Sequence, residues 1–165
     1  MGETETGKTV EIVDVADELV TKEPGVLVIG VHGGKFHLDD AMSCYLLSAL
    51  YGARCGRSVR VHRSAADGRD LDDCDVVVDV GMEYDHARRR YDHHQRGFAE
   101  TFDAQHATKL SACGLIYKHY GQEIIANLAR KYDPFAAPLT AAQLAWFHRK
   151  WYATFFEAID ANDNG

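Results

Sequence analysis

Three features that mark other protein classes are missing from this chain of 165 residues. No apolar stretch approaches the roughly 20 residues of a transmembrane helix, so we expect no membrane partner. The N-terminus lacks a basic segment followed by an apolar one, so we expect no secretory signal. The sequence also contains no internal repeat and no low-complexity segment, which argues against a repeat architecture.

Positive charge is also in short supply, because the formal net charge is −7 at pH 7. A protein that binds nucleic acid through a broad basic face is normally positive. Any phosphate-bearing substrate must therefore be held locally, by metal ions and a few arginines. The remaining composition, with 46% hydrophobic and 26% charged residues, is typical of a globular domain with its own core.

Paired cysteine motifs are absent as well, although the sequence contains four separate cysteines. Cys44, Cys55, Cys74 and Cys113 stand mostly in apolar surroundings, and we interpret them as reduced core residues. Reduced thiols and a missing signal together predict an intracellular protein.

Short apolar runs alternate with helical patterns, which predicts an α/β fold with a mostly parallel central sheet flanked by helices. The expected strands are Val26–Val31, Ser58–His62, Asp75–Val80 and a short one over Arg89–Asp92. The expected helices cover residues 40–51, from Thr108 or Ser111 to 120, 123–132, and a long segment after Thr140. Asp39 is the expected N-cap of the first helix, which Gly52 would end, and Gly121 would stop the second. In the last helix, one apolar face is expected from Leu144, Phe147, Trp151, Phe155 and Ile159.

The chain divides into two parts by composition. Residues 1–24 are acidic and end at Pro24-Gly25, and we interpret them as an arm in front of a single domain over residues 25–165. The sequence stops after an acidic, glycine-bearing turn over residues 160–165. We interpret this stop as a domain boundary, with a second domain missing from the chain.

Side chains with metal-binding chemistry follow two of the expected strands. His32 ends the first strand, His37 and Asp39 come shortly after it, and Asp79 closes a run of three valines. In an open α/β sheet, sites form outside the carboxyl ends of the strands. Histidines and carboxylates together suit a hard or borderline divalent metal, and their number favours more than one ion. The alternative is that His37 and Asp39 simply cap the following helix.

The run Asp92-His93-His94 is the most specific signal in the sequence. An acidic residue beside two imidazoles lets one histidine bind metal while a carboxylate orients it. A solvated turn is the alternative, and the presence of Asp79 and of the first cluster argues against it.

Further candidate residues are basic, hydroxylic or acidic. Arg90 and Arg96 bracket the histidine pair, and they either clamp phosphate oxygens or form a solvated basic turn. Lys109 and Ser111 are further phosphate candidates. Asp160 is favoured over Asp163 as a last carboxylate ligand, with a merely polar terminus as the alternative.

Other polar and aromatic residues receive structural interpretations. Five histidines lack ligand-like spacing, and we expect them to be surface or satisfied core residues: His62, His86, His106, His119 and His148. The aromatic residues of the last helix are interpreted as core rather than as a base-stacking platform: Trp146, Trp151, Phe155 and Phe156.

Asp92-His93-His94 resembles the signature of the DHH phosphoesterase superfamily, which includes RecJ-type exonucleases and the manganese family II pyrophosphatases. A closer resemblance is to the melanocyte-proliferating-gene family, often labelled metal-dependent protein hydrolases. His37 fits this closer family, whereas the superfamily usually has Asp there. The resemblance covers about Gly30 to the last residue, through the segments 32–41, 74–81, 90–96, 108–117 and 160–165.

The resemblance implies a two-manganese site and phosphodiester hydrolysis. Family members are regarded as 3′–5′ RNA exonucleases of nucleus and mitochondria, so the cytoplasm, nucleus or mitochondrion is the expected location. On matching positions, Asp79 would bridge the metals, His94 would contact the substrate phosphate, and Asp92 would lie behind the histidine pair. The implied metal ligands are His32, His37, Asp39, Asp79, His93 and Asp160.

The sequence therefore predicts a metal-dependent phosphodiesterase of the exonuclease type, with RNA or a nucleotide as substrate. Two ions about 3.5–4 Å apart would activate water near Asp79. Manganese is the implied metal, although this ligand set also accepts zinc, iron or cobalt. One alternative is a hydrolase of small phosphates, such as pyrophosphate or short nucleotides, and another is a non-catalytic metal-bearing scaffold. A homodimer and a monomer both stay open.

Overall fold

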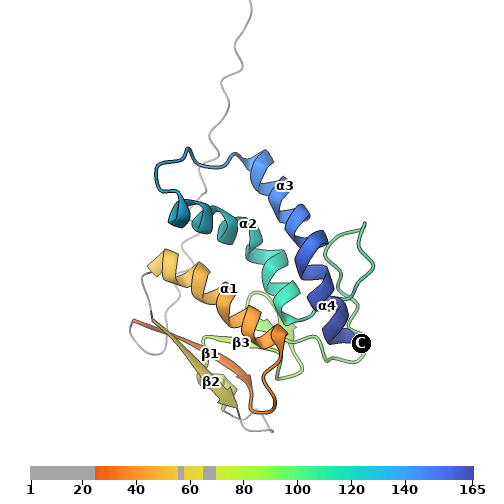
Figure 1. Cartoon of the computed structure of the whole chain (residues 1–165). Coiled ribbons are helices and arrows are strands. Elements are labelled where there is room, and N and C mark those ends of the chain that lie inside the picture. Colours follow the sequence, from red (N-terminus) through yellow and green to blue (C-terminus); the bar gives the residue numbers. More distant parts are fainter. Residues whose placement is uncertain (1–24, 56–57, 65–69) are drawn as a thin grey trace, which may run out of the picture.

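The computed structural model describes residues 25–55, 58–64 and 70–165 (Figure 1). The arm expected over residues 1–24 lies outside these described residues. Among the described residues, no helix has the length and apolar character needed to span a membrane.

Five strands form one sheet in the order β2-β1-β3-β5-β4. They are β1 (Val26–His32), β2 (Ser58–Ser64), β3 (Val76–Val78), β4 (Tyr84–Asp85) and β5 (Arg90–Tyr91). β1 pairs in parallel with β2 and β3, and β3 pairs in parallel with β5, whereas β4 adds an antiparallel edge. The predicted α/β fold with a mostly parallel sheet is confirmed. β4 was not predicted, because two residues are too few to show an alternating pattern.

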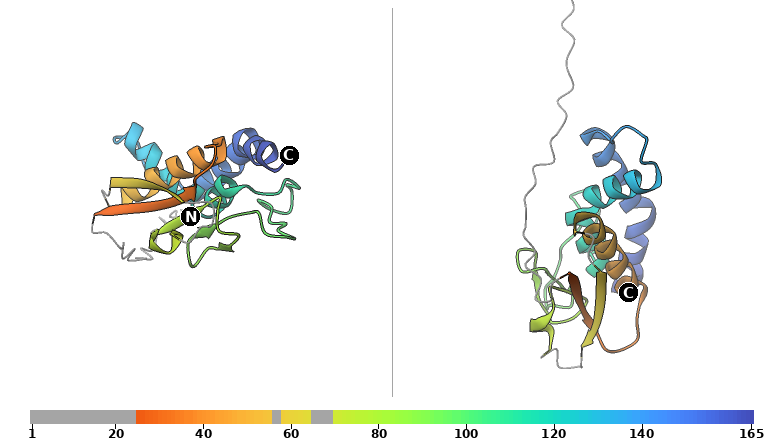
Figure 2. Two further views of the ribbon diagram at one scale, coloured as in Figure 1. Left: turned by 90° about the horizontal axis from the view of Figure 1, so that it is seen from below. Right: turned by 90° about the vertical axis from the view of Figure 1, so that its left-hand side faces the viewer.

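The α-helices are layered on one face of the sheet, as Figure 2 shows. They are α1 (Leu38–Cys55), α2 (Ala112–Tyr132), α3 (Ala141–Trp151) and α4 (Glu157–Asn164). Val76 and Val78 of β3 pack into the large core beneath these helices. Val77 points the other way, into a small cluster with Leu71 and Cys74 beside the short helix η1 (Leu71–Asp73). Both faces of β3 are covered, which explains its unbroken run of valines.

Two helices run through glycines that were expected to end them. α1 begins at Leu38, so Asp39 lies in its first turn instead of capping it, and the helix continues past Gly52 to Cys55. α2 continues through Gly121, so the two expected helices are one. A Cβ atom at Gly121 would lie 2.5 Å from Cδ2 of His148. This glycine therefore marks the close packing of α2 against α3 and not a helix end.

The long last helix is interrupted by a π-helical segment, η2 (Tyr152–Phe156). Thr140 caps its start as predicted, with a capping box formed with Gln143. A π-helical turn changes the rotation of the residues that follow it. As a result Tyr152 is buried together with Phe156, and the expected straight apolar face does not form.

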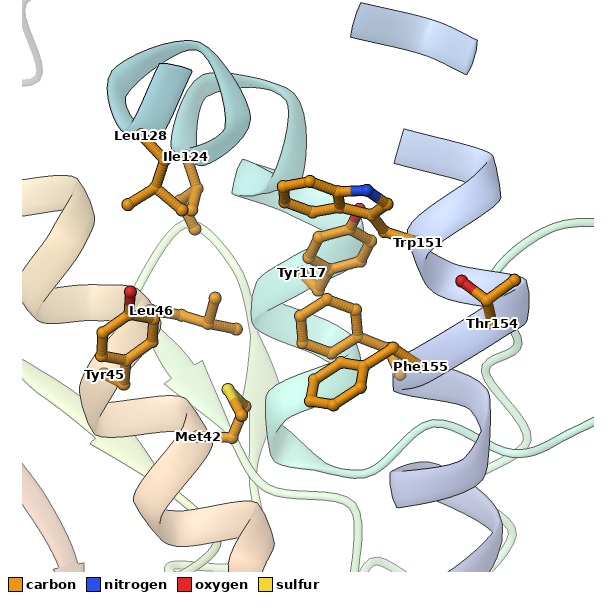
Figure 3. A pocket seen from close by; sticks show the side chains of 10 residues that line it. Met42, Tyr45, Leu46, Tyr117, Ile124, Leu128, Trp151, Thr154 and Phe155 are labelled. Carbon is orange, nitrogen blue, oxygen red and sulfur yellow. The ribbon is translucent and has the colours of Figure 1, made fainter. Parts of the chain in front are cut away.

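Three aromatic residues predicted for the core lie on the surface instead. Trp146, Trp151 and Phe155 are 53%, 38% and 49% exposed, so the core interpretation is wrong for them, although it holds for Phe156. Trp151 and Phe155 line an open apolar groove of about 390 Å³, facing Met42 of α1 (Figure 3). The missed feature is the π-helical turn, which the hydrophobic pattern does not reveal.

Candidate metal centre

Histidines and carboxylates gather where β1, β3 and β5 end, beside the first turns of α1 and α2 and the last turn of α4. We call this cluster the candidate metal centre. It contains three groups of residues, and within each group the possible ligand atoms lie within 4.8 Å of one another. The groups are His32, His37, Asp40 and Asp79; Asp79, His93 and His94; and Asp39, Asp79, His93 and Asp163.

Asp79 belongs to every one of these groups in the described part of the chain. Directly after β3 its backbone adopts a φ of 56°, an uncommon left-handed conformation for a residue other than glycine. Its amide donates to the Tyr91 carbonyl at 3.1 Å, which holds this turn against β5. The carboxylate oxygen Oδ2 lies 3.5 Å from Nε2 of His32, and Oδ1 lies 3.2 Å from Nε2 of His93. Asp79 thus presents one carboxylate oxygen to His32 and the other to His93.

His32 reaches the first group from the end of β1. Its Nε2 lies 2.9 Å from Oδ2 of Asp40, and its Nδ1 accepts the Gly34 amide at 3.1 Å. In this tautomer Nε2 carries the proton, which must leave before a metal can bind there. Asp40 is fully buried and also accepts the His37 amide at 2.8 Å, while the His37 ring is exposed. Asp40 was not predicted as a ligand, because the early start of α1 is what turns it into the site.

His93 is oriented for metal binding by Asn164 of α4. The Asn164 amide nitrogen donates to the carbonyls of Lys109 and Asp160, at 2.8 and 2.9 Å. Its Oδ1 is therefore the atom that accepts from Nδ1 of His93, at 3.1 Å. With Nδ1 held as the donor, Nε2 is the nitrogen that faces Asp79 and Asp163, and its lone pair can bind a metal once Nε2 has given up its proton. Sequence reasoning missed Asn164, because a lone asparagine near a helix end carries no ligand signal.

Replacing Asn164 with alanine is expected to weaken Mn²⁺ binding about 10–100-fold, the usual cost of losing a group that orients a ligand. Calorimetric titration of the chain with Mn²⁺ measures this change. Asn162→Ala, at an exposed position of the same helix, is the matched control and should keep the parent affinity. Equal affinities for the parent and Asn164→Ala would show that His93 needs no such orientation.

The carboxylates around His93 hold it in the charged form. Burial lowers the pKa of His93, but the hydrogen bonds with Asp163 and Asp79 outweigh burial and raise this pKa to about 10. The same hydrogen bond lowers the pKa of the Asp163 carboxyl. The surroundings of His93 therefore favour a positive charge between these carboxylates, as a bound cation would supply.

Ser111 connects two buried carboxyls at the start of α2. Its hydroxyl faces Oδ1 of Asp39 at 2.5 Å and Oδ1 of Asp160 at 2.8 Å. Asp39 also accepts the Cys113 amide at 2.7 Å, so both carboxyls sit at the positive end of α2. Burial raises the pKa of Asp39 to about 6 and also raises that of Asp160. Ser111 has a single hydroxyl proton and can donate it to only one of the two carboxylates at a time. The charge of Asp39 and the charge of Asp160 are therefore coupled through Ser111.

Asp163 and not Asp160 lies among the grouped ligand atoms. Oδ2 of Asp163 is 3.0 Å from Nε2 of His93. Asp160 is turned away, because its carboxyl accepts from the Ser111 amide and from the Tyr152 hydroxyl at 3.0 and 2.9 Å. The geometry therefore favours Asp163 as the last ligand and gives Asp160 the role of holding Ser111.

Asp92 fixes His94 from behind. The buried Asp92 carboxylate accepts Nδ1 of His94 at 2.7 Å, its amide at 3.1 Å and the Met82 amide at 2.5 Å. The His94 side chain itself is 53% exposed, so its Nε2 can reach a substrate. In this pair a buried carboxylate supports an exposed imidazole.

The predicted phosphate-binding residues are spread more widely than expected. Arg96 is exposed, but Arg90 is half-buried and donates to the carbonyls preceding it in the chain. Lys109 is half-buried, and Ser111 is fully buried on two carboxyls and closed to a phosphate. Arg63 of β2, which sequence reasoning did not select, donates to the carbonyls of the glycine pair that follows His32.

The five remaining histidines have partners outside the candidate metal centre, as their surface or satisfied interpretation requires. Each has a polar partner: His62 with Asp70, His86 with Tyr91, His106 with Glu157, His119 with Tyr84, and His148 with the Tyr117 carbonyl.

Two buried oxygens of the candidate metal centre support its assignment to cations. Oδ2 of Asp39 and Oδ1 of Asp40 are buried without a hydrogen-bond partner among the described residues. Burying a carboxylate oxygen is costly unless it is paired or binds a metal. Imidazole nitrogens and carboxylate oxygens in this arrangement fit divalent ions such as manganese, zinc or iron.

Comparisons with known proteins agree on one family. The family model MYG1_exonuc, described as "Uncharacterised protein family (UPF0160)", matches residues 28–165. The chain is 42% identical over 142 residues to a human protein named MYG1 exonuclease, covering 83% of this chain and 35% of that protein. It is 39% identical to the MYG1 proteins C27H6.8 of Caenorhabditis elegans, over 142 residues, and YER156C of Saccharomyces cerevisiae, over 137 residues.

The two MYG1 proteins are matched over 84% and 83% of this chain. These alignments cover 39% and 37% of the relatives' own lengths, so the chain spans well under half of the curated relatives that it matches. No solved structure shows a significant match.

Proposed function

Because this chain belongs to the MYG1 family, we propose that it is a divalent-metal-dependent phosphoesterase that hydrolyses RNA as an exonuclease. The relatives named MYG1 exonuclease support a nuclease-type hydrolase. The observation that carries the proposal is the position of Asp79, with one oxygen toward His32 and Asp40 and the other toward His93. A carboxylate placed in this way is suited to join two cations.

Membership of the DHH phosphoesterase superfamily is part of the proposal. It is supported by His93 and His94, which stand next to Asp92 in the chain and lie beside Asp79 in the structure. We take the ions to be two Mn²⁺, held by His32, His37 and Asp40 on one side of Asp79, and by Asp39, His93 and Asp163 on the other.

The protein side chains supply binding, orientation and proton handling. Two bound cations would supply an activated water and neutralise charge on the phosphoryl oxygens. Asp92 keeps the His94 ring in one orientation, so Nε2 points outward and can donate to a phosphoryl oxygen when protonated. Ser111 and Asn164 hold Asp39 and His93 in place before substrate arrives, so no reorganisation is needed at the moment of reaction.

The proposal is tested by incubating the chain with single-stranded RNA labelled at either end, with Mn²⁺ or with a chelator. We expect mononucleotides to be released from one end only, with no release when the metal is removed. Pyrophosphate is the parallel substrate, because the net charge of −7 would also suit a small phosphate. Hydrolysis of pyrophosphate but not of RNA would show that the protein is a hydrolase of small phosphates. Metal binding without hydrolysis of either substrate would indicate a non-catalytic scaffold.

A further inference from the structure

A second pocket lies apart from the candidate metal centre, between α3, η2 and the loop before α2. Its volume is about 410 Å³, within the range of about 300–1,000 Å³ that small ligands occupy. The residues that line it are Gln105, His106, Trp146, Arg149, Lys150 and Ala153. This aromatic–basic pocket contains two cationic side chains and no carboxylate.

The helix wall of the pocket combines an exposed indole with positive charge. Trp146 is 53% exposed, although a tryptophan is usually highly buried. Arg149 and Lys150 follow at spacings of three and four residues, which places them beside Trp146 on one helix face. Such a face can stack a base on the indole and bind the adjacent phosphates through the two cations.

The opposite wall is held rigidly. Nδ1 of His106 lies 3.1 Å from Oε2 of Glu157, and its ring packs edge-on against Tyr152 at 4.8 Å. Two carboxylates in this region are already engaged, because Glu157 also accepts the Thr108 hydroxyl, and Asp103 accepts the Gln105 amide. Both carboxylates keep their negative charge, but in the described part of the chain neither forms an ion pair with Arg149 or Lys150.

The pocket is connected to the candidate metal centre by two segments that run alongside each other. His106 and Thr108 contact Glu157 at the start of α4, and the Lys109 carbonyl accepts from Asn164 at its end. At about 1.5 Å per residue, the helical path from Ala153 to Asp163 is about 15 Å. A mononucleotide at the metal centre does not reach so far, whereas an oligonucleotide can.

We propose that this aromatic–basic pocket binds a nucleotide of single-stranded nucleic acid whose terminal phosphodiester lies in the candidate metal centre. The inference rests on the proposed nuclease function and adds a location for the strand beyond the scissile bond. It also explains how a chain with a net charge of −7 can hold an anionic polymer, because the positive charge that attracts the strand is concentrated in the aromatic–basic pocket.

Binding of a labelled oligouridylate, measured by fluorescence anisotropy in the presence of chelator, separates this inference from catalysis. Trp146→Ala is expected to raise Kd about 5- to 150-fold, while Trp146→Phe keeps most of the affinity. Trp151→Ala is the matched control, because this exposed indole of the same helix lines the other groove, and it should bind like the parent. Oligothymidylate in place of oligouridylate reports whether the pocket distinguishes RNA from DNA.

The two cations are tested through salt dependence. Arg149→Gln with Lys150→Gln should reduce the slope of log Kd against log salt by about 1.4, since each phosphate contact on a single strand contributes about 0.7. Arg130→Gln with Lys131→Gln, at the exposed end of α2, should leave the slope unchanged. Parent binding that is absent, or equally tight without Trp146, would overturn the inference. Loss of binding in Trp146→Ala without any RNA hydrolysis by the parent would sustain nucleic-acid binding at the pocket and refute the proposed function.

Discussion

Replacing Asp79 with asparagine is expected to abolish metal loading and hydrolysis together. The parent should bind about two Mn²⁺ per chain, measured by elemental analysis after gel filtration, and the variant should bind less than one. Losing a group that merely orients a ligand costs about 10–100-fold, so losing the shared ligand should lower kcat/KM by more than about 100-fold. The amide keeps the shape of the side chain but removes its charge and one of its two acceptor oxygens.

The Asp79→Asn variant is also expected to fold, which makes its activity loss interpretable. Asparagine adopts the left-handed backbone conformation more readily than most residues, so the φ of 56° is tolerated. Asp72→Asn in η1 applies the same chemical change at an exposed position and should keep both ions and full activity. Two ions bound by Asp79→Asn would refute the shared position of this carboxylate.

Adding a single methyl group at Gly114 is expected to destabilise the chain strongly. A Cβ atom there would lie 2.3 Å from Oδ1 of Asp160, a carboxyl that is fully buried and bonded to Ser111 and Tyr152. Overpacking of this kind typically costs about 1–3 kcal/mol, and displacement of the buried carboxyl adds to it. Urea unfolding followed by circular dichroism measures the change in the free energy of unfolding.

The matched control for Gly114→Ala is the same substitution at Gly52. In α1 a Cβ at position 52 would meet no atom within 4 Å, so Gly52→Ala should stabilise the chain by about 0.5–1 kcal/mol. Opposite signs for the two variants would establish that α2 and α4 are pressed together at Asp160. A Gly114→Ala variant as stable as the parent would show that the contact between α2 at position 114 and the Asp160 carboxyl is looser than described.

The sheet edge that carries the site was predictable from the sequence, although β3 stops at Val78 and not at the expected Val80, and β2 runs on past His62 to Ser64. A run of valines before Asp79 and of apolar residues before His32 indicates two buried parallel strands, and parallel strands end at the same edge. The sequence did not indicate Asp40, because only the start of α1 at Leu38 turns this carboxylate into the site together with Asp39. It could not rank Asp163 above Asp160 either, since both stand on α4 and only the packing of Tyr152 and Ser111 separates them.

The surface of the last helix was the least predictable part. A regular helical period places Trp151 and Phe155 on the buried face, but the π-helical η2 turns Tyr152 and Phe156 inward in their place. Hydrophobic periodicity assumes a constant rotation per residue, so it cannot anticipate such a turn. Trp146, on which the nucleic-acid pocket depends, lies before this turn in α3 and is exposed on the surface of that helix.

The candidate metal centre is also expected to assemble late in folding. The hydrogen bonds from His93 to Asn164 and from Ser111 to Asp39 join residues 71 and 72 positions apart. Contacts across such separations form slowly, and α4, the last element in chain order, must dock before His93 is oriented. Metal capture then follows folding instead of guiding it. Manganese should accordingly lengthen the lifetime of the native chain by slowing its unfolding, and leave the refolding rate almost unchanged.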